Sequence, residues 1–68
     1  MKWLFQSYMV KAHIPSFRAL AKETGIEYRT LIRHVENTQL FRVFELAALD
    51  EVLRFSDEDM VRILRGRT

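Results

Sequence analysis

Residues that break helices are scarce in this chain, and their scarcity constrains the fold more than any other feature. The 68 residues include one proline, Pro15, and two glycines, Gly25 and Gly66. A β fold rich in turns needs many more such residues, whereas helices need none within their spans. The chain is 49% hydrophobic and has no cysteine, so it can bury a core but has neither disulfides nor thiolate metal ligands to stabilise it. We therefore expect a single all-α domain over residues 1–68.

Apolar spacing and capping residues predict five short helices. From Phe5 onward, apolar residues recur at i, i+3, i+4 and i+7, which is one face of a helix. The chain then breaks before Pro15, because proline disfavours helical backbone at the residue that precedes it. Ser16 and Ser56 are N-cap residues, and Gly25 suits the left-handed position just past a helix end. With their capping residues, the expected helices span about residues 2–12, 16–25, 28–37, 43–53 and 56–66.

Positive charge is concentrated in the first part of the chain. Residues 1–42 hold seven Lys or Arg and three acids, a net charge of +4, whereas residues 43–68 hold four Arg and six acids, a net charge of −2. This asymmetry favours a first part that meets an anion, with ordinary scatter of surface charge as the alternative. The first residues are too few and too polar for a signal peptide or a membrane span. We expect a cytoplasmic protein with no membrane partner.

The predicted helix over residues 28–37 has an inner side and a charged outer side. At about 100° per residue, Leu31 and Val35 lie on the inner side. Arg29 and Arg33 lie one turn apart on the outer side, where like charges destabilise a helix by roughly a few tenths of a kcal/mol. A negatively charged partner between the two arginines would turn this repulsion into attraction. A solvated helix surface is the alternative interpretation.

The outer side also has the chemistry of a nucleic-acid contact. An arginine fork matches O6 and N7 of guanine, or a phosphate, with two hydrogen bonds. An exposed isoleucine can contact the methyl group of thymine, and a tyrosine hydroxyl can reach a phosphate. The candidate base-contacting residues are Tyr28, Arg29, Ile32 and Arg33.

The order of residues around Gly25 resembles a known family. Ala21 stands four residues before Gly25, Ile26 follows it, and Leu31 comes six residues after it. This is similar to the helix-turn-helix of the Cro and lambda-repressor-like (XRE-type) regulators. In that family the small residue lets two helices cross closely, the glycine makes the turn, and the leucine position anchors the recognition helix. The segments TGIEYRTLIRHVEN and FELAALDEVLRFSDEDMVRIL resemble small phage and prophage regulators in particular, and the resemblance covers about residues 10–64.

The resemblance implies a five-helix, lambda-repressor-like DNA-binding domain that acts as a sequence-specific transcriptional regulator. Its partner is a double-stranded DNA operator, with the second helix across the DNA backbone and the third in the major groove. Glu27 stands where the family often has a capping serine, so we expect a weak cap on the third helix. The expected contacts to the DNA backbone are Ser16, Arg18, Thr30, Asn37, Thr38 and Arg42.

Two other functions are compatible with the same fold. The modest net charge of +2 and the acids Glu27 and Glu36 favour a protein-interaction module, such as an antirepressor or a scaffold, that does not bind DNA. The antitoxin of a toxin pair is the other alternative. If the chain binds DNA, one helix reads few base pairs, so we expect a weak homodimer that forms on the operator. Spare apolar residues that could form its contact are Trp3, Val10 and Val61.

The sequence predicts neither an enzyme nor a metal or cofactor site. His13 and His34 are the only histidines, and no carboxylate pattern completes a metal site around them. We interpret His34 as a residue that packs between helices or lies near phosphates. No Ser/His/Asp or paired-carboxylate arrangement is recognisable, and the acids at 57–59 are explained by helix capping.

Overall fold

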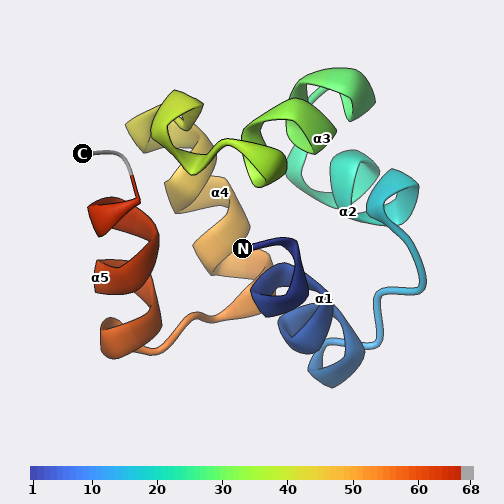
Figure 1. Cartoon of the computed structure of the whole chain (residues 1–68). Helices are drawn as coiled ribbons and strands as arrows, with labels where there is room; N and C mark the ends of the chain where they lie inside the picture. Colours follow the sequence, from blue (N-terminus) through green and yellow to red (C-terminus); the bar gives the residue numbers. More distant parts are fainter. Residues whose placement is uncertain (67–68) are drawn as a thin grey trace.

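The computed structural model describes residues 1–66, and within this range the chain is entirely helical, without β-strands (Figure 1). The prediction of an all-α fold with five α-helices is confirmed, and the observed bounds lie within about two residues of the expected ones. The connection before α4 contains a short 3-10 helix, η1, that was not predicted. The elements are α1 (Lys2–Lys11), α2 (Phe17–Thr24), α3 (Tyr28–Glu36), η1 (Thr38–Leu40), α4 (Val43–Leu53) and α5 (Asp57–Arg65).

Local capping explains where two of these helices, α2 and α5, begin and end. The Ser16 hydroxyl accepts a hydrogen bond from the Ala19 amide at 3.1 Å, and α5 begins at Ser56 in the same way. Gly25 ends α2 with a φ of 76°, the left-handed conformation that glycine adopts without strain. Gly66 follows α5 for a different reason, since its φ is an ordinary −64°. A Cβ at this position would collide with the Thr38 hydroxyl.

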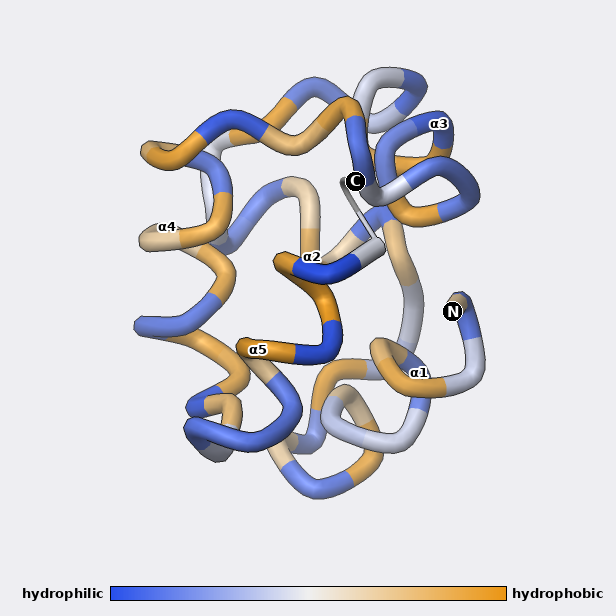
Figure 2. The backbone as a smooth tube through the Cα atoms, turned by 60° about the vertical axis from the view of Figure 1, so that its left-hand side comes forward, coloured by the Kyte–Doolittle hydropathy of each residue, from blue (hydrophilic) through white to orange (hydrophobic). Residues whose placement is uncertain are grey.

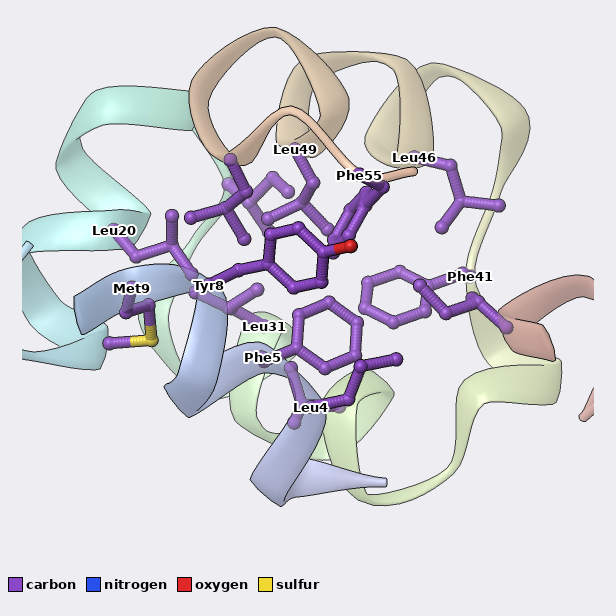
Figure 3. Close-up of a cluster of buried hydrophobic side chains, with 14 of the residues drawn as sticks. Leu4, Phe5, Tyr8, Met9, Leu20, Leu31, Phe41, Leu46, Leu49 and Phe55 are labelled. Carbon is purple, nitrogen blue, oxygen red and sulfur yellow. The ribbon is translucent and has the colours of Figure 1, made fainter. Parts of the chain in front are cut away.

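The core is built around four aromatic rings that come from distant parts of the chain (Figure 3). Phe5 of α1 stacks on Phe41 with ring centroids 5.7 Å apart and meets the edge of Phe55 at 5.6 Å. Tyr8 meets Phe55 edge-on at 4.9 Å. Such pairs contribute about 0.5–1.5 kcal/mol beyond the area they bury. The rings therefore tie α1 to the segments on both sides of α4.

Tyr8 also fixes the start of α5 through its hydroxyl group. The hydroxyl oxygen accepts a hydrogen bond from the Ser56 amide at 3.0 Å and donates one to the Asp59 carboxylate at 2.5 Å. The hydrogen bond from Tyr8 holds the pKa of Asp59 below its ordinary value. Since Tyr8 lies 48 residues before Ser56, this contact joins the two ends of the described chain.

The helices leave α2 and α3 together on one side of the molecule. Figure 1 shows these two helices at the upper right, α5 at the left and α4 between them. Apolar and polar residues alternate along the backbone (Figure 2). Helices α2, α3 and α5 have distinct apolar and polar sides, whereas the most exposed large apolar residues lie on α1 and α4. The chain measures 29 × 22 × 19 Å. Within residues 1–66, no helix has both the length and the apolar composition that a membrane span requires.

Candidate nucleic-acid interface

Helices α2 and α3 pack against each other around the tight turn at Gly25. Ala21 and Ile26 are buried on either side of the turn, and Leu31 is fully buried in α3. The Thr24 hydroxyl donates to the carbonyl of Leu20 at 2.9 Å and accepts weakly from the Ile26 amide at 3.4 Å. The turn is therefore held by a small buried residue at the crossing, a glycine in the left-handed conformation and a threonine hydroxyl that closes it.

Glu27 is a strong cap for α3, so the expectation of a weak cap was wrong. Its two carboxylate oxygens accept hydrogen bonds from the amides of Thr30 at 2.9 Å and Arg29 at 3.1 Å. The longer glutamate side chain thus caps the helix as a serine would, and it adds a negative charge at the positive end of the helix. These backbone hydrogen bonds, from Arg29 first and then Thr30, lower the pKa of Glu27.

The outward side of α3 carries two arginines with free guanidinium groups. Arg29 and Arg33 are exposed, and neither guanidinium makes a hydrogen bond or an ion pair with residues 1–66. Leu31 and Val35 anchor the opposite side of the helix in the core, as predicted. We call the outward set of Tyr28, Arg29, Ile32 and Arg33 the α3 outer surface.

Tyr28 and Ile32 are half-buried, although the sequence suggested that they are exposed. Tyr28 packs partly against the core, and the guanidinium carbon of Arg18 lies 4.2 Å from the centre of its ring. This cation–π contact joins α2 to α3 and was not anticipated. The guanidinium of Arg18 donates no side-chain hydrogen bond to residues 1–66, so its N–H groups remain able to donate to a phosphate.

Two of the six residues expected to contact the DNA backbone have their hydroxyl groups buried or hydrogen-bonded within the protein, and the burial of Thr38 contradicts its expected contact. Thr38 is only 6% exposed and lies beneath Gly66, so its hydroxyl cannot reach a phosphate. The Thr30 hydroxyl donates to Glu27 at 3.0 Å. A phosphate oxygen can only accept a hydrogen bond, so the Thr30 hydroxyl would have to release Glu27 before it could donate to a phosphate.

The other four expected backbone contacts remain open to solvent. Arg18, Asn37 and Arg42 are exposed. Ser16 is exposed as well, and its hydroxyl accepts from Ala19, which leaves its own proton free to donate. Arg18 and Ser16 precede α3, whereas Asn37 and Arg42 follow it, so the four residues flank the α3 outer surface in sequence.

His34 packs between α3 and α4, which confirms the first of its two interpretations. Its Nδ1 lies 3.0 Å from a carboxylate oxygen of Glu45, and its ring meets Phe41 edge-on at 5.5 Å. The same oxygen of Glu45 accepts from the Arg42 amide at 2.9 Å, so this buried acid caps α4. The signal in the sequence was a glutamate three residues after the N-cap position, which is typical of a capping box.

Metal-binding groups of side chains are absent from the described part of the chain, since residues 1–66 contain no group of three or more His, Asp or Glu side chains that could hold a metal ion. Comparison with protein-family models, with curated proteins and with solved structures gives no significant match to this chain. The α3 outer surface and its flanking residues are therefore the candidate site, on the geometry alone.

Proposed function

We propose that this protein is a sequence-specific DNA-binding regulator of the lambda-repressor-like class. The observation that carries the proposal is the pair Arg29 and Arg33, exposed one turn apart with free guanidinium groups on a helix that Leu31 and Val35 anchor. Two unpaired cations side by side are unfavourable in the free protein and favourable against a polyanion.

The dimensions of α3 suit the major groove. An α-helix with its side chains is about 10–12 Å across, and the major groove of B-DNA is about 12 Å wide and admits one α-helix. The nine residues of α3 make a helix about 13 Å long that can lie in the groove. In this pose Arg29 and Arg33 face base edges, where an arginine fork pairs best with guanine. Tyr28 and Ile32, which are half-buried, contribute only their outer edges to the contact.

Residues on both sides of α3 supply the phosphate contacts in this proposal. Arg18 and Ser16 at the start of α2 approach one DNA strand, while Asn37 and Arg42 approach the other. The Glu27 carboxylate is exposed and ionised at the start of α3, where it repels a nearby phosphate, and the positive end of the helix dipole and three hydrogen bonds partly offset its charge. The role is non-catalytic and needs no cofactor.

Selection of binding sites from random double-stranded DNA tests the proposal. Fluorescence anisotropy on the selected site then compares Arg29→Ala and Arg33→Ala with Arg62→Ala, a control that removes an exposed arginine from α5. We expect each α3 variant to lose about 1–3 kcal/mol of binding free energy, and the control to lose little.

The main rival is a protein-interaction module with the same fold, and the selection separates the two. Failure to enrich any sequence, together with weak binding at low salt, would exclude the DNA-binding role. If a sequence is enriched but all three variants lose the same binding free energy, the protein binds DNA, but α3 is not the helix that reads the bases.

A further inference from the structure

An apolar surface that was not predicted from the sequence lies at the start of α4. Val43 is 76% exposed and Phe44 67% exposed. Ala47 is also exposed and follows Val43 by one helical turn. We call these three residues the α4 surface. Figure 2 shows orange backbone on the outer turn where α4 begins and blue backbone further along the same side. Exposed apolar groups of this size commonly mark an interaction site.

The other end of the same helix is hollowed. A surface depression of about 620 Å³ lies where α4 meets the loop to α5. Its lining residues are Asp50, Glu51, Arg54 and Phe55, and we call it the α4 hollow. By helical spacing, positions 50, 51 and 54 share the outward side with the α4 surface. A projecting phenylalanine and a hollow thus lie on one side of one helix, about 9–15 Å apart along its axis.

We propose that a second copy of this chain docks antiparallel on α4, so that Phe44 of each copy enters the α4 hollow of the other. A two-fold axis near Ala47 and Ala48 produces both contacts at once, as an isologous interface requires. The two alanines are small, so the helices can approach closely at the axis. Phe55, the apolar residue among those that line the hollow, offers the incoming ring a partner.

Charge along α4 favours the same antiparallel arrangement. Asp50 and Glu51 lie near the negative end of their own helix dipole, which is unfavourable. The antiparallel partner brings the positive end of its α4, together with Arg42, toward these acids. Glu51 has no hydrogen bond or ion pair with any residue in the described range 1–66. A parallel pair would place acids against acids instead.

The contact is too small to hold two free copies together. A stable interface buries about 800 Å² per partner, which is more than three exposed side chains and one hollow provide. Pairing on adjacent DNA half-sites raises the effective concentration and makes a weak contact sufficient. This role on DNA rests on the proposed function, whereas the contact itself does not.

Cysteine cross-linking tests the contact without DNA, because the natural chain has no cysteine. We expect Ala47→Cys, next to the two-fold axis, to form a disulfide-linked dimer on oxidation much faster than Val10→Cys, a control on α1 that also tests the alternative contact through the exposed Trp3, Val10 and Val61. Phe44→Ser in the Ala47→Cys background should reduce the rate to that of the control. Equal rates for Ala47→Cys and Val10→Cys, or no effect of Phe44→Ser, would overturn the proposal.

Binding to a selected DNA site with two half-sites tests the role of the contact. Val43→Asn and Val10→Asn remove side chains that are exposed almost equally, at 76% and 75%. We expect Val43→Asn to keep its affinity for a single half-site and to lose about tenfold in cooperativity on the double site, while Val10→Asn keeps both. Equal behaviour of the two variants, or one copy per double site at saturation, would overturn this role. Cross-linking without any DNA binding would instead reject the proposed function and leave the α4 contact standing.

Discussion

The guanidinium of Arg18 lies over the ring of Tyr28, 4.2 Å from its centre, and this contact joins the first helix of the α2–α3 pair to the second. Because of this contact, the contributions of Arg18 and Tyr28 to the stability of the protein depend on each other. The stack orients Tyr28 at the edge of the α3 outer surface and holds Arg18 beside α3. Arg18 is therefore a positioning residue for α3 as well as a candidate phosphate contact.

A double-mutant cycle measures this coupling in the free protein. Arg18→Gln removes the cation and Tyr28→Leu removes the ring, and urea unfolding gives the free energy of unfolding of each variant and of the pair. We expect a coupling energy of about 0.5–1 kcal/mol, the usual value for an exposed cation–π contact. Additive losses would show that the two side chains do not interact in solution.

Sequence reasoning succeeded for the helices because their boundaries depend on near neighbours. Ser16 caps an amide three residues away, and Gly25 ends α2 through its own backbone conformation. Both signals are contained in a few consecutive residues. The anchors Leu31 and Val35 were also predictable, since helical periodicity alone puts them on one side.

The errors at the candidate site come from contacts that span the chain or from unusual partners. The burial of Thr38 depends on Gly66, which lies 28 positions further along the sequence. Glu27 was judged a weak cap because glutamate is uncommon at that position, yet its longer side chain reaches two amides. Local patterns cannot show that Phe44 faces solvent, because its neighbour Glu45 is the residue that turns inward.

Because Gly66 lies against Thr38, a smaller residue at position 38 should restore stability that is lost when position 66 is enlarged. Gly66→Ala places a methyl group against the Thr38 hydroxyl, and we expect this overpacking to cost about 1–3 kcal/mol of unfolding free energy. Thr38→Ser keeps the hydroxyl and should not relieve the clash, whereas Thr38→Ala in the Gly66→Ala background should restore part of the loss. Thermal unfolding of the parent, of Gly66→Ala and of the two double variants measures these changes in stability. Equal stability of Gly66→Ala and the parent would contradict the close approach.

Removal of the Tyr8 hydroxyl should lower the stability of the folded protein and change how that stability depends on pH. Tyr8→Phe leaves the Ser56 amide without its partner, which costs about 1–3 kcal/mol. The pKa of Asp59 is lowered in the folded state, chiefly by the hydrogen bond from Tyr8. The carboxylate therefore contributes stability above its ordinary pKa of 3.8, and this contribution disappears as the pH falls through the lower folded value.

Urea unfolding of the parent and Tyr8→Phe at neutral pH and in acid measures both effects. The difference in stability between the two proteins should be larger at neutral pH than in acid. A difference that does not change with pH would mean that Asp59 does not depend on Tyr8.

Glu27→Gln separates the charge of the α3 cap from its hydrogen bonds. Glutamine can still accept a hydrogen bond from one amide, but it has no charge at the positive end of the helix. Because hydrogen bonds lower the folded pKa of Glu27, the parent gains stability above the ordinary pKa and loses it in acid. We expect a lower melting temperature for Glu27→Gln at neutral pH and convergence with the parent at low pH. Glu23→Gln, an exposed acid on α2, serves as the control and should change neither value.

The salt dependence of DNA binding distinguishes the residues that flank α3 from those on its outer surface. If Arg42 contacts a phosphate, Arg42→Ala should weaken binding to all sequences alike and reduce the slope of log K against log salt by about one unit. Arg33→Ala should weaken the selected site more than random DNA, because a base contact carries sequence information. Anisotropy titrations of both variants at several salt concentrations, on selected and random DNA, provide the comparison. A sequence-selective loss for Arg42→Ala would place that arginine in a groove. The protein would then lie on the DNA with the start of α4 closer to the bases than proposed.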